Sequence, residues 1–359
     1  MSLKKSFEFT PWYNWPDEYR LRNQEALEEY KRNNYDSISS ILWQQFCLYQ
    51  RWGEIQQYAQ DRNIMIFGDM PIFVAHDSAD TWMSPEQFLL NEDSQPAVVA
   101  GVPPDYFSET GQRWGNPHYN WDEMRLNNFE WWKQRLKNHF SLFDLVRIDH
   151  FRGLEAVWVI PAECDTAIDG EWIKVPGEEL LEHLKQEMGD LAIVAEDLGI
   201  ITPEVNELRK KFVLPGMSVL QFSFDSFSDN PHKPQNITYD RIVYSGTHDN
   251  DTTMGWFNSE NEDNQNHILE ALDSSDPKKV AEKIIEVVIN SAGQLAVFPL
   301  QDLLNLGSDA RMNVPGVSDN NWSWKFQWEQ LTDELAQQTR TRLEAASRLL
   351  TMEVTNGSS

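Results

Sequence analysis

The stretch FDLVRID, residues 143–149, is an apolar run that ends on an acidic residue, and runs of this form decide the fold class. Five others are IMIFGD at 64–69, LAIVAED at 191–197, MSVLQFSFD at 217–225, RIVYSGTHD at 241–249 and LAVFPLQD at 295–302. Nearly continuous apolar runs of this length are typical of strands buried on both faces, as in parallel sheets. Helix-like stretches follow most of them. Six such strands alternating with helical segments predict an α/β barrel or a doubly wound sheet.

The barrel is the better prediction because acidic residues stand at the carboxyl ends of several strands, where barrel enzymes carry their chemistry. A dinucleotide-binding sheet would have a GxGxxG turn after its first strand, and none is present. We expect three parts: a helical segment over 1–62, a catalytic barrel portion over 63–326, and a C-terminal helix and tail over 327–359. Within the barrel portion, residues 75–140 are expected to form an inserted subdomain and lid.

Composition limits the possible partners of the chain. Its 359 residues include 30 Lys and Arg against 57 Asp and Glu, a formal net charge of −27. This charge argues against nucleic acid and anionic membranes as partners.

No apolar run reaches the ~18 residues of a transmembrane helix, and the start lacks the apolar core of a signal peptide, so we expect a cytoplasmic protein. The two cysteines, Cys47 and Cys164, are too few for a disulfide framework. The 15 Trp, 18 Phe and 10 Tyr residues weakly favour sugar binding, because aromatic rings stack on sugar rings.

Three carboxylates are the candidate catalytic groups: Asp149 in RIDHFRG, Glu196 in AEDLG and Asp249 in GTHDND. Each follows a predicted strand, and successive ones are separated by more than the ~30 residues of a minimal strand–helix–strand unit. All three can therefore meet at one barrel mouth.

Glycosidic bond cleavage uses such carboxylates, one that meets the developing oxocarbenium ion and one that protonates the leaving oxygen. Arg147 lies two residues before Asp149 on the same face of the predicted strand, so its charge can keep that carboxylate ionised. Glu196 needs the opposite environment. We expect the negative charges of Asp149 and Asp249 to raise its pKa toward neutrality.

Two other interpretations of these residues stay open at this point. Acidic residues at strand ends often cap the next helix or pair with arginine, without any catalytic role. A metallohydrolase site could in principle be built from Asp149, His150, Glu196, His248 and Asp249. However, no HxH or HExxH motif is present, and the many aromatic residues would be unexplained.

Seven segments together resemble the amylomaltases, the 4-alpha-glucanotransferases of glycoside hydrolase family 77, whose plant relatives are called disproportionating enzymes. They are GDMPIFVAHDSADTW (68–82), GVPPDYFSETGQRWGNPHYNW (101–121), FDLVRIDHFRG (143–153), AEDLGIITPEV (195–205), PGMSVLQFSF (215–224), YSGTHDNDTTMGW (244–256) and ARMNVPG (310–316). These segments run in the order of the family across nearly the whole chain.

The resemblance implies residue roles. Asp149 is the expected nucleophile, Glu196 the general acid/base and Asp249 the transition-state stabiliser. The expected substrate contacts come from the strand ends, a loop over the site and the segment after the last strand: Asp69, Tyr106, Phe107, Gln112, Trp114, Arg147, Phe222, His248 and Asn313.

The implied activity is transfer of 1,4-alpha-glucan segments between malto-oligosaccharides by a retaining double displacement, with no cofactor and no metal. The resemblance also implies a (β/α)8 barrel of which this chain holds strands three to eight, with the missing N-terminal segment as an expected partner and a plastid as the location in a plant. On this view the chain alone is expected to be poorly stable or inactive. The alternatives are an alpha-glucan hydrolase and an inactive glucan-binding fragment.

Overall fold

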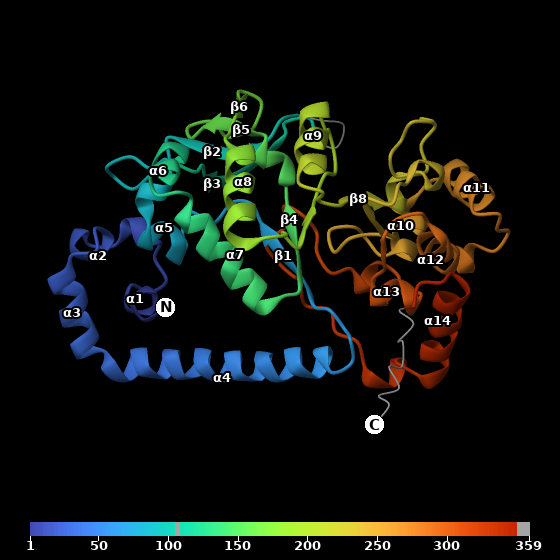
Figure 1. Cartoon of the computed structure of the whole chain (residues 1–359), viewed down its shortest axis with the longest axis horizontal. Helices are drawn as coiled ribbons and strands as arrows, with labels where there is room; N and C mark the ends of the chain where they lie inside the picture. The colour runs from blue at the N-terminus through green and yellow to red at the C-terminus, as the bar shows by residue number, and fades with distance from the viewer. Residues whose placement is uncertain (105–107, 350–359) are drawn as a thin grey trace. The chain divides into compact units, whose positions relative to one another are not determined.

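The chain folds into two compact units of mixed α/β structure. The structure is a computed structural model, which describes residues 1–104 and 108–349 (Figure 1). The first unit is Met1–Leu214 and the second is Pro215–Ser359. The division into 1–62, 63–326 and 327–359 stays a prediction.

The first unit begins with helices, as the apolar spacing over residues 17–62 predicts. They are α1 (Ser2–Ser6), α2 (Asp17–Arg20), α3 (Gln24–Asn33) and α4 (Tyr35–Gln60). The side chain of Asn23 caps α3 by accepting a hydrogen bond from the backbone N–H of Ala26. Helix α4 is held near its end, where Trp52 donates its indole N–H to the carbonyl of Leu142 at 3.0 Å.

A parallel sheet in the order β1-β4-β7 lies at the centre of the first unit. Its strands are β1 (Phe67–Pro71), β4 (Leu145–Asp149) and β7 (Ile193–Ala195). Asp69 is opposite Arg147 in the register, and Ile148 is opposite Ala195. The carboxyl ends of the three strands are therefore level, so the residues that follow them share one edge.

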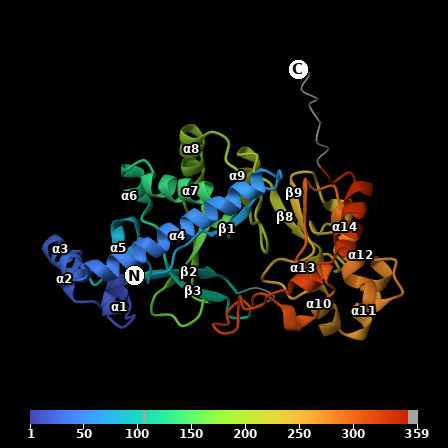
Figure 2. The ribbon, with the colours of Figure 1, turned by 90° about the horizontal axis from the view of Figure 1, so that it is seen from below.

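Helices cover this sheet and close its core. They are α6 (Trp121–Leu126), α7 (Glu130–Leu142), α8 (Gly177–Met188) and α9 (Pro203–Lys211) (Figure 2). Helix α5 (Ala79–Met83) instead contacts the N-terminal residues, where the Thr81 hydroxyl accepts the indole N–H of Trp12 at 3.1 Å. Val146 and Ile148 of β4 are fully buried in one apolar cluster with Leu136 of α7 and Leu180 of α8. Burial of both faces explains why the strand runs are almost continuously apolar.

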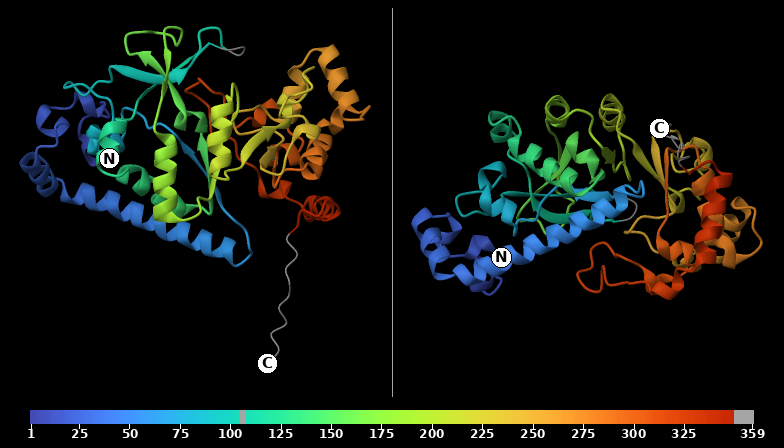
Figure 3. Two further views of the ribbon diagram at one scale, coloured as in Figure 1. Left: turned by 45° about the horizontal axis from the view of Figure 1, so that its top comes forward. Right: turned by 60° about the horizontal axis from the view of Figure 1, so that its bottom comes forward.

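Part of the expected inserted subdomain forms a second, antiparallel sheet in the order β3-β2-β5-β6. Its strands are β2 (Val98–Val102), β3 (Gln112–Pro117), β5 (Ala156–Pro161) and β6 (Glu171–Lys174), the cyan and green strands in the left view of Figure 3. The sequence analysis did not predict this sheet. Its strands are short, and β2 pairs with β5, which follows β4 in the chain, a pairing that local patterns do not reveal.

The second unit carries the other three predicted strands as a parallel sheet in the order β10-β9-β8. These are β8 (Gly216–Val219), β9 (Arg241–Tyr244) and β10 (Leu295–Val297), with Tyr244 in register with both Val219 and Val297. The helices of this unit are α10 (Thr253–Ser259), α11 (Glu262–Ala271), α12 (Val280–Asn290), α13 (Leu300–Leu303) and α14 (Asp333–Ala345). Ile284 and Val288, one turn apart on α12, pack with Val243 of β9 in the core.

All six runs quoted at the outset thus contain strands, and the prediction of parallel pairing is confirmed within each of the two sheets that these strands form. Among the described residues, no helix is both long and apolar enough to cross a membrane.

Candidate active site

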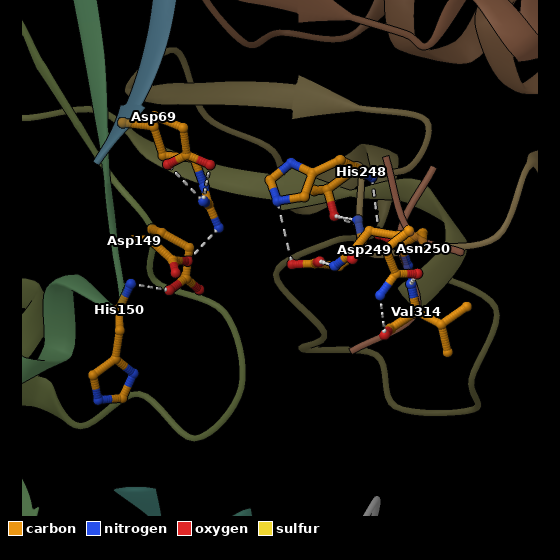
Figure 4. A network of polar contacts seen from close by, with 12 residues as sticks. Asp69, Asp149, His150, His248, Asp249, Asn250 and Val314 are labelled. Atoms are coloured by element: carbon orange, nitrogen blue, oxygen red, sulfur yellow. Dashed lines mark hydrogen bonds and ion pairs between the residues drawn. The ribbon is translucent and has the colours of Figure 1, made fainter. Parts of the chain in front are cut away.

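In the first unit, charged side chains gather at the carboxyl edge of the sheet β1-β4-β7. Asp69 comes from β1, Arg147 and Asp149 come from β4, and Glu196 follows β7 directly. Asp69 and Asp149 are labelled in Figure 4. The structure therefore brings together four of the residues that the sequence analysis selected.

Arg147 connects the two aspartates. Its Nη1 donates to both carboxylate oxygens of Asp69, at 2.9 and 2.7 Å, and its Nη2 donates to Oδ1 of Asp149 at 2.7 Å. The arginine is 7% exposed. Burial alone would lower its pKa, but the charges of Asp149, Asp69 and Glu196 raise the pKa above the ordinary value. The guanidinium therefore holds the Asp149 carboxylate by charge and hydrogen bonding, as predicted.

Glu196 is held by neutral donors. Its Oε2 accepts the backbone N–H of His150 at 2.6 Å, and its Oε1 accepts that of Leu198 at 2.7 Å. Burial raises the pKa of Glu196 to about 7, and the negative charge of Asp149 adds to the rise, against the opposing charge of Arg147 and the two backbone bonds. The predicted direction is thus found, with burial as the larger cause, while the contribution expected from Asp249 stays a prediction.

His150 adopts a left-handed backbone conformation with φ of 57°, which turns its N–H toward Glu196. Its imidazole meets the Trp114 ring edge-on, with 4.8 Å between centroids. Burial lowers the His150 pKa to about 4, so this ring is neutral at neutral pH. Trp114 lies on β3 and donates its indole N–H to the Gln112 side chain at 3.1 Å. Gln112 and Trp114 are thus connected to the residue that follows Asp149.

In the second unit, the loop between β9 and α10 carries Asp249. Its Oδ1 accepts a hydrogen bond from Nδ2 of Asn313 at 2.6 Å, and its Oδ2 lies 3.5 Å from Nε2 of His248. Arg311 donates to the backbone carbonyl of Asp249 at 2.8 Å and to that of Asn313 at 2.9 Å. His248, Asp249 and the neighbouring Asn250 are labelled in Figure 4. The structure therefore brings together three more predicted residues.

The same loop is stiffened from inside. Oδ1 of Asn250 accepts the backbone N–H and the hydroxyl of Thr247, both at 2.9 Å. The ring of His248 lies 5.2 Å from that of Trp322. These contacts fix the turn at whose apex Asp249 stands.

The remaining predicted residues are less closely tied to these groups. Phe222 ends the short 3-10 helix after β8, where its ring contacts that of His232 at 5.6 Å. Tyr106 and Phe107 lie outside the described residues. Among the residues that the structure describes, no three His, Cys, Asp or Glu side chains form a group suited to a metal ion.

Sequence reasoning missed the backbone donors of His150 and Leu198 and the contact from Arg311. Every residue except proline has a backbone N–H, so residue types do not reveal which of these groups will donate to Glu196. Arg311 does stand in the quoted segment ARMNVPG, two residues before Asn313, so that segment was the available signal.

Comparisons with known proteins agree on one family. Residues 1–332 match the model of glycoside hydrolase family 77, 4-alpha-glucanotransferase. The 4-alpha-glucanotransferase of Thermus thermophilus is 45% identical over 97% of this chain and 71% of its own length. The chloroplastic/amyloplastic 4-alpha-glucanotransferase of Solanum tuberosum is 43% identical over 90% of this chain and 56% of its own length.

A solved structure gives the same answer. The amylomaltase of Streptococcus agalactiae in complex with acarbose has a TM-score of 0.93 and 35% identity, covering 97% of this chain and 71% of that one. The chain thus spans between about half and about seven-tenths of the length of these relatives. With the carboxylates and their partners in place on matching motifs, the chain belongs to the 4-alpha-glucanotransferases of glycoside hydrolase family 77.

Proposed function

We propose that this chain is a 4-alpha-glucanotransferase that moves 1,4-alpha-glucan segments between malto-oligosaccharides by a retaining double displacement. The observation that carries the proposal is the contrast between two neighbouring carboxylates. Arg147 binds Asp149 at 2.7 Å, whereas backbone N–H groups hold Glu196 in a buried place that raises its pKa to about 7. One group is suited to attack and the other to carry a proton.

In the first step, a carboxylate oxygen of Asp149 forms a bond to the anomeric carbon of the donor glucose. The bond from that carbon to the glycosidic oxygen breaks, and Glu196 gives its proton to this oxygen. The leaving glucan departs with a free 4-hydroxyl group. Arg147 stays bound to Asp69 and can keep the nucleophile aligned during this step.

In the second step, the now ionised Glu196 takes the proton of an acceptor 4-hydroxyl. The hydroxyl oxygen attacks the same anomeric carbon, the bond to Asp149 breaks, and the alpha configuration is restored. Transfer requires that the acceptor reach the intermediate before water does. Trp114, packed against His150, can cover this position with an apolar ring and so disfavour hydrolysis.

Asp249 is proposed to hold sugar hydroxyl groups as charge develops on the ring, with its carboxylate oriented by Asn313. We also propose a (β/α)8 barrel as the fold of the enzyme. The TM-score of 0.93 to the Streptococcus agalactiae amylomaltase supports this barrel, and that protein was solved with acarbose. We place the enzyme in the cytoplasm or, for a plant, in the plastid, as the name of the potato relative suggests.

The test is Asp149→Asn, assayed with maltotriose. The wild-type chain should form a ladder of shorter and longer malto-oligosaccharides with little net release of reducing ends, whereas a hydrolase would release them. Asp149→Asn should reduce turnover by more than about 10⁴-fold, because an amide cannot act as the nucleophile. Acarbose binding, measured by calorimetry, should change less than tenfold.

Asp122→Asn is the matched control, since this carboxylate is 96% exposed and belongs to α6, not to the carboxyl edge of the sheet β1-β4-β7. It should keep wild-type transfer. Turnover retained in Asp149→Asn would overturn the proposed function. A wild-type chain that binds acarbose but forms no ladder would also overturn it, in favour of the inactive glucan-binding fragment that the sequence analysis left as an alternative.

A further inference from the structure

Asp302, on α13 of the second unit, is a buried carboxylate to which the reaction scheme above gives no part. Its side chain is 3% exposed. Oδ2 accepts hydrogen bonds from the hydroxyl groups of Ser245 at 2.6 Å and Thr253 at 2.8 Å. Oδ1 accepts the backbone N–H of Thr253 at 2.7 Å. Both partners are fully buried.

The two partners stand at opposite ends of one loop. Ser245 follows the last residue of β9, and Thr253 is the first residue of α10. The loop between them carries His248 and Asp249. One carboxylate from a distant segment therefore closes the base of the loop that bears the proposed transition-state stabiliser.

This closure is costly as a purely structural device. Burial raises the pKa of Asp302, and the hydrogen bonds from Ser245 and Thr253 act in the opposite direction. Among the residues that the structure describes, no cationic group pairs with Asp302. Well-packed apolar residues are often as stable as a buried carboxylate at such positions, or more stable. What an apolar residue cannot do is fix both ends of the loop by directed bonds.

Other contacts hold the middle of the loop rather than its base. Arg311 binds the backbone of Asp249, and Gln221 donates to the carbonyl of Asp251 at 3.0 Å. Asp251 also accepts a bond from the Ser308 hydroxyl at 2.6 Å. These contacts act on residues 249 and 251, whereas Asp302 acts on the two ends of the loop.

We propose that Asp302 is a positioning residue of the transfer reaction, which acts by holding Ser245 and Thr253 together and so setting where the Asp249 carboxylate meets the sugar. This inference rests on the proposed function. Asp302 itself touches no substrate in this scheme.

The first test removes one bond at a time from equally buried positions. Ser245→Ala deletes one donor to Asp302, while Ser218→Ala, the matched control, deletes a bond from another fully buried serine to the carbonyl of Pro231. Loss of one hydrogen bond predicts a fall in kcat of about three- to tenfold for Ser245→Ala, with KM for maltotriose changed less than about twofold. Ser218→Ala should leave kcat within about twofold of wild type. Equal kcat for the two variants would overturn the inference.

The second test compares two replacements of the carboxylate. In Asp302→Asn, the amide oxygen can still accept the Thr253 N–H, while the amide nitrogen donates to the two hydroxyl oxygens, which turn to accept. Asp302→Ala leaves all three donors without this partner. We expect kcat within about tenfold of wild type for the amide and a fall of about 100-fold for alanine. If the amide variant loses as much as the alanine variant while both stay folded by circular dichroism, the inference fails.

The deciding experiment is a double-mutant cycle with Asp249→Asn. That variant alone should lower kcat by about 10²- to 10³-fold. If Asp302 acts through Asp249, adding Asp302→Ala should cost less than about threefold more, whereas a merely structural role would multiply the two losses. Multiplicative losses overturn the inference and leave the proposed function intact. Wild-type activity of Asp249→Asn would instead show that the proposed function itself is wrong.

Discussion

The pH dependence of transfer is the sharpest consequence of the Glu196 environment. In the proposed mechanism Glu196 is the general acid and must be protonated in the free enzyme, and burial raises its pKa from 4.5 to about 7. An acid with the ordinary pKa would be protonated in only about 0.3% of molecules at pH 7, against about half for Glu196. The difference corresponds to about 3 kcal/mol. The buried position therefore keeps a usable fraction of acid at neutral pH.

For maltotriose, kcat/KM should fall on the alkaline side with a midpoint near the pKa of about 7. Above the pKa of a carboxyl group, its protonated fraction falls about tenfold per pH unit. The value of kcat/KM should therefore be about 10% of its plateau at pH 8 and about 1% at pH 9. Initial rates of disproportionation measured from pH 5 to pH 9.5 at constant ionic strength give this profile.

A second substrate tests whether the alkaline loss of activity comes from the proposed acid, Glu196. Fluoride leaves alpha-maltosyl fluoride with little help from a proton, so its release depends on the nucleophile and not on the acid. Initial fluoride release should therefore stay nearly constant from pH 6 to pH 9, while the maltotriose rate falls about 100-fold over the upper part of that range. Parallel loss with both substrates, or a maltotriose midpoint near the ordinary value of 4.5, would refute the reasoning.

Two further predictions concern the partners of the carboxylates. Arg147→Met removes a cation that lowers the Glu196 pKa, so the alkaline midpoint should move upward. Its kcat should fall about 10²- to 10³-fold as the ion pairs with Asp69 and Asp149 break. Arg147→Lys should keep the midpoint closer to wild type, since the charge stays. Pre-steady-state and pH-rate measurements on both variants check this. Asn313→Ala removes the 2.6 Å bond to Asp249 and should lower kcat about three- to tenfold with thermal unfolding nearly unchanged; an unaltered kcat would count against the role of Asn313.

The strands could be predicted because their signal is local and strong. In FDLVRID, Val146 and Ile148 are buried against the helices. Arg147 lies between them and Asp149 follows them, at the carboxyl edge of the sheet. Period-two spacing places Arg147 and Asp149 on one face without knowledge of the fold, and their 2.7 Å contact follows.

The supporting groups could not be predicted in the same way. Asp302 ends the apolar run LAVFPLQD just as Asp149 ends its own run, and sequence alone does not separate a carboxylate that faces a sugar from one buried between Ser245 and Thr253. The antiparallel sheet was missed for a related reason, since its pairings join segments on both sides of β4. Partners distant along the chain decide both cases.

The kind of partner, more than the kind of acid, separates the proposed roles of Asp149 and Glu196. A guanidinium beside a carboxylate favours the charged form strongly, so a cation placed directly on Glu196 would remove the proton that the first step needs. The backbone N–H groups of His150 and Leu198 orient the same carboxylate with partial charges only, and burial then raises its pKa in spite of them. Because the donor from His150 belongs to the residue next to Asp149, the proposed nucleophile and the proposed acid are both connected to one turn of backbone. A change that moves this turn should therefore alter attack and proton transfer together, whereas a change at Arg147 should act first on the charge balance between them.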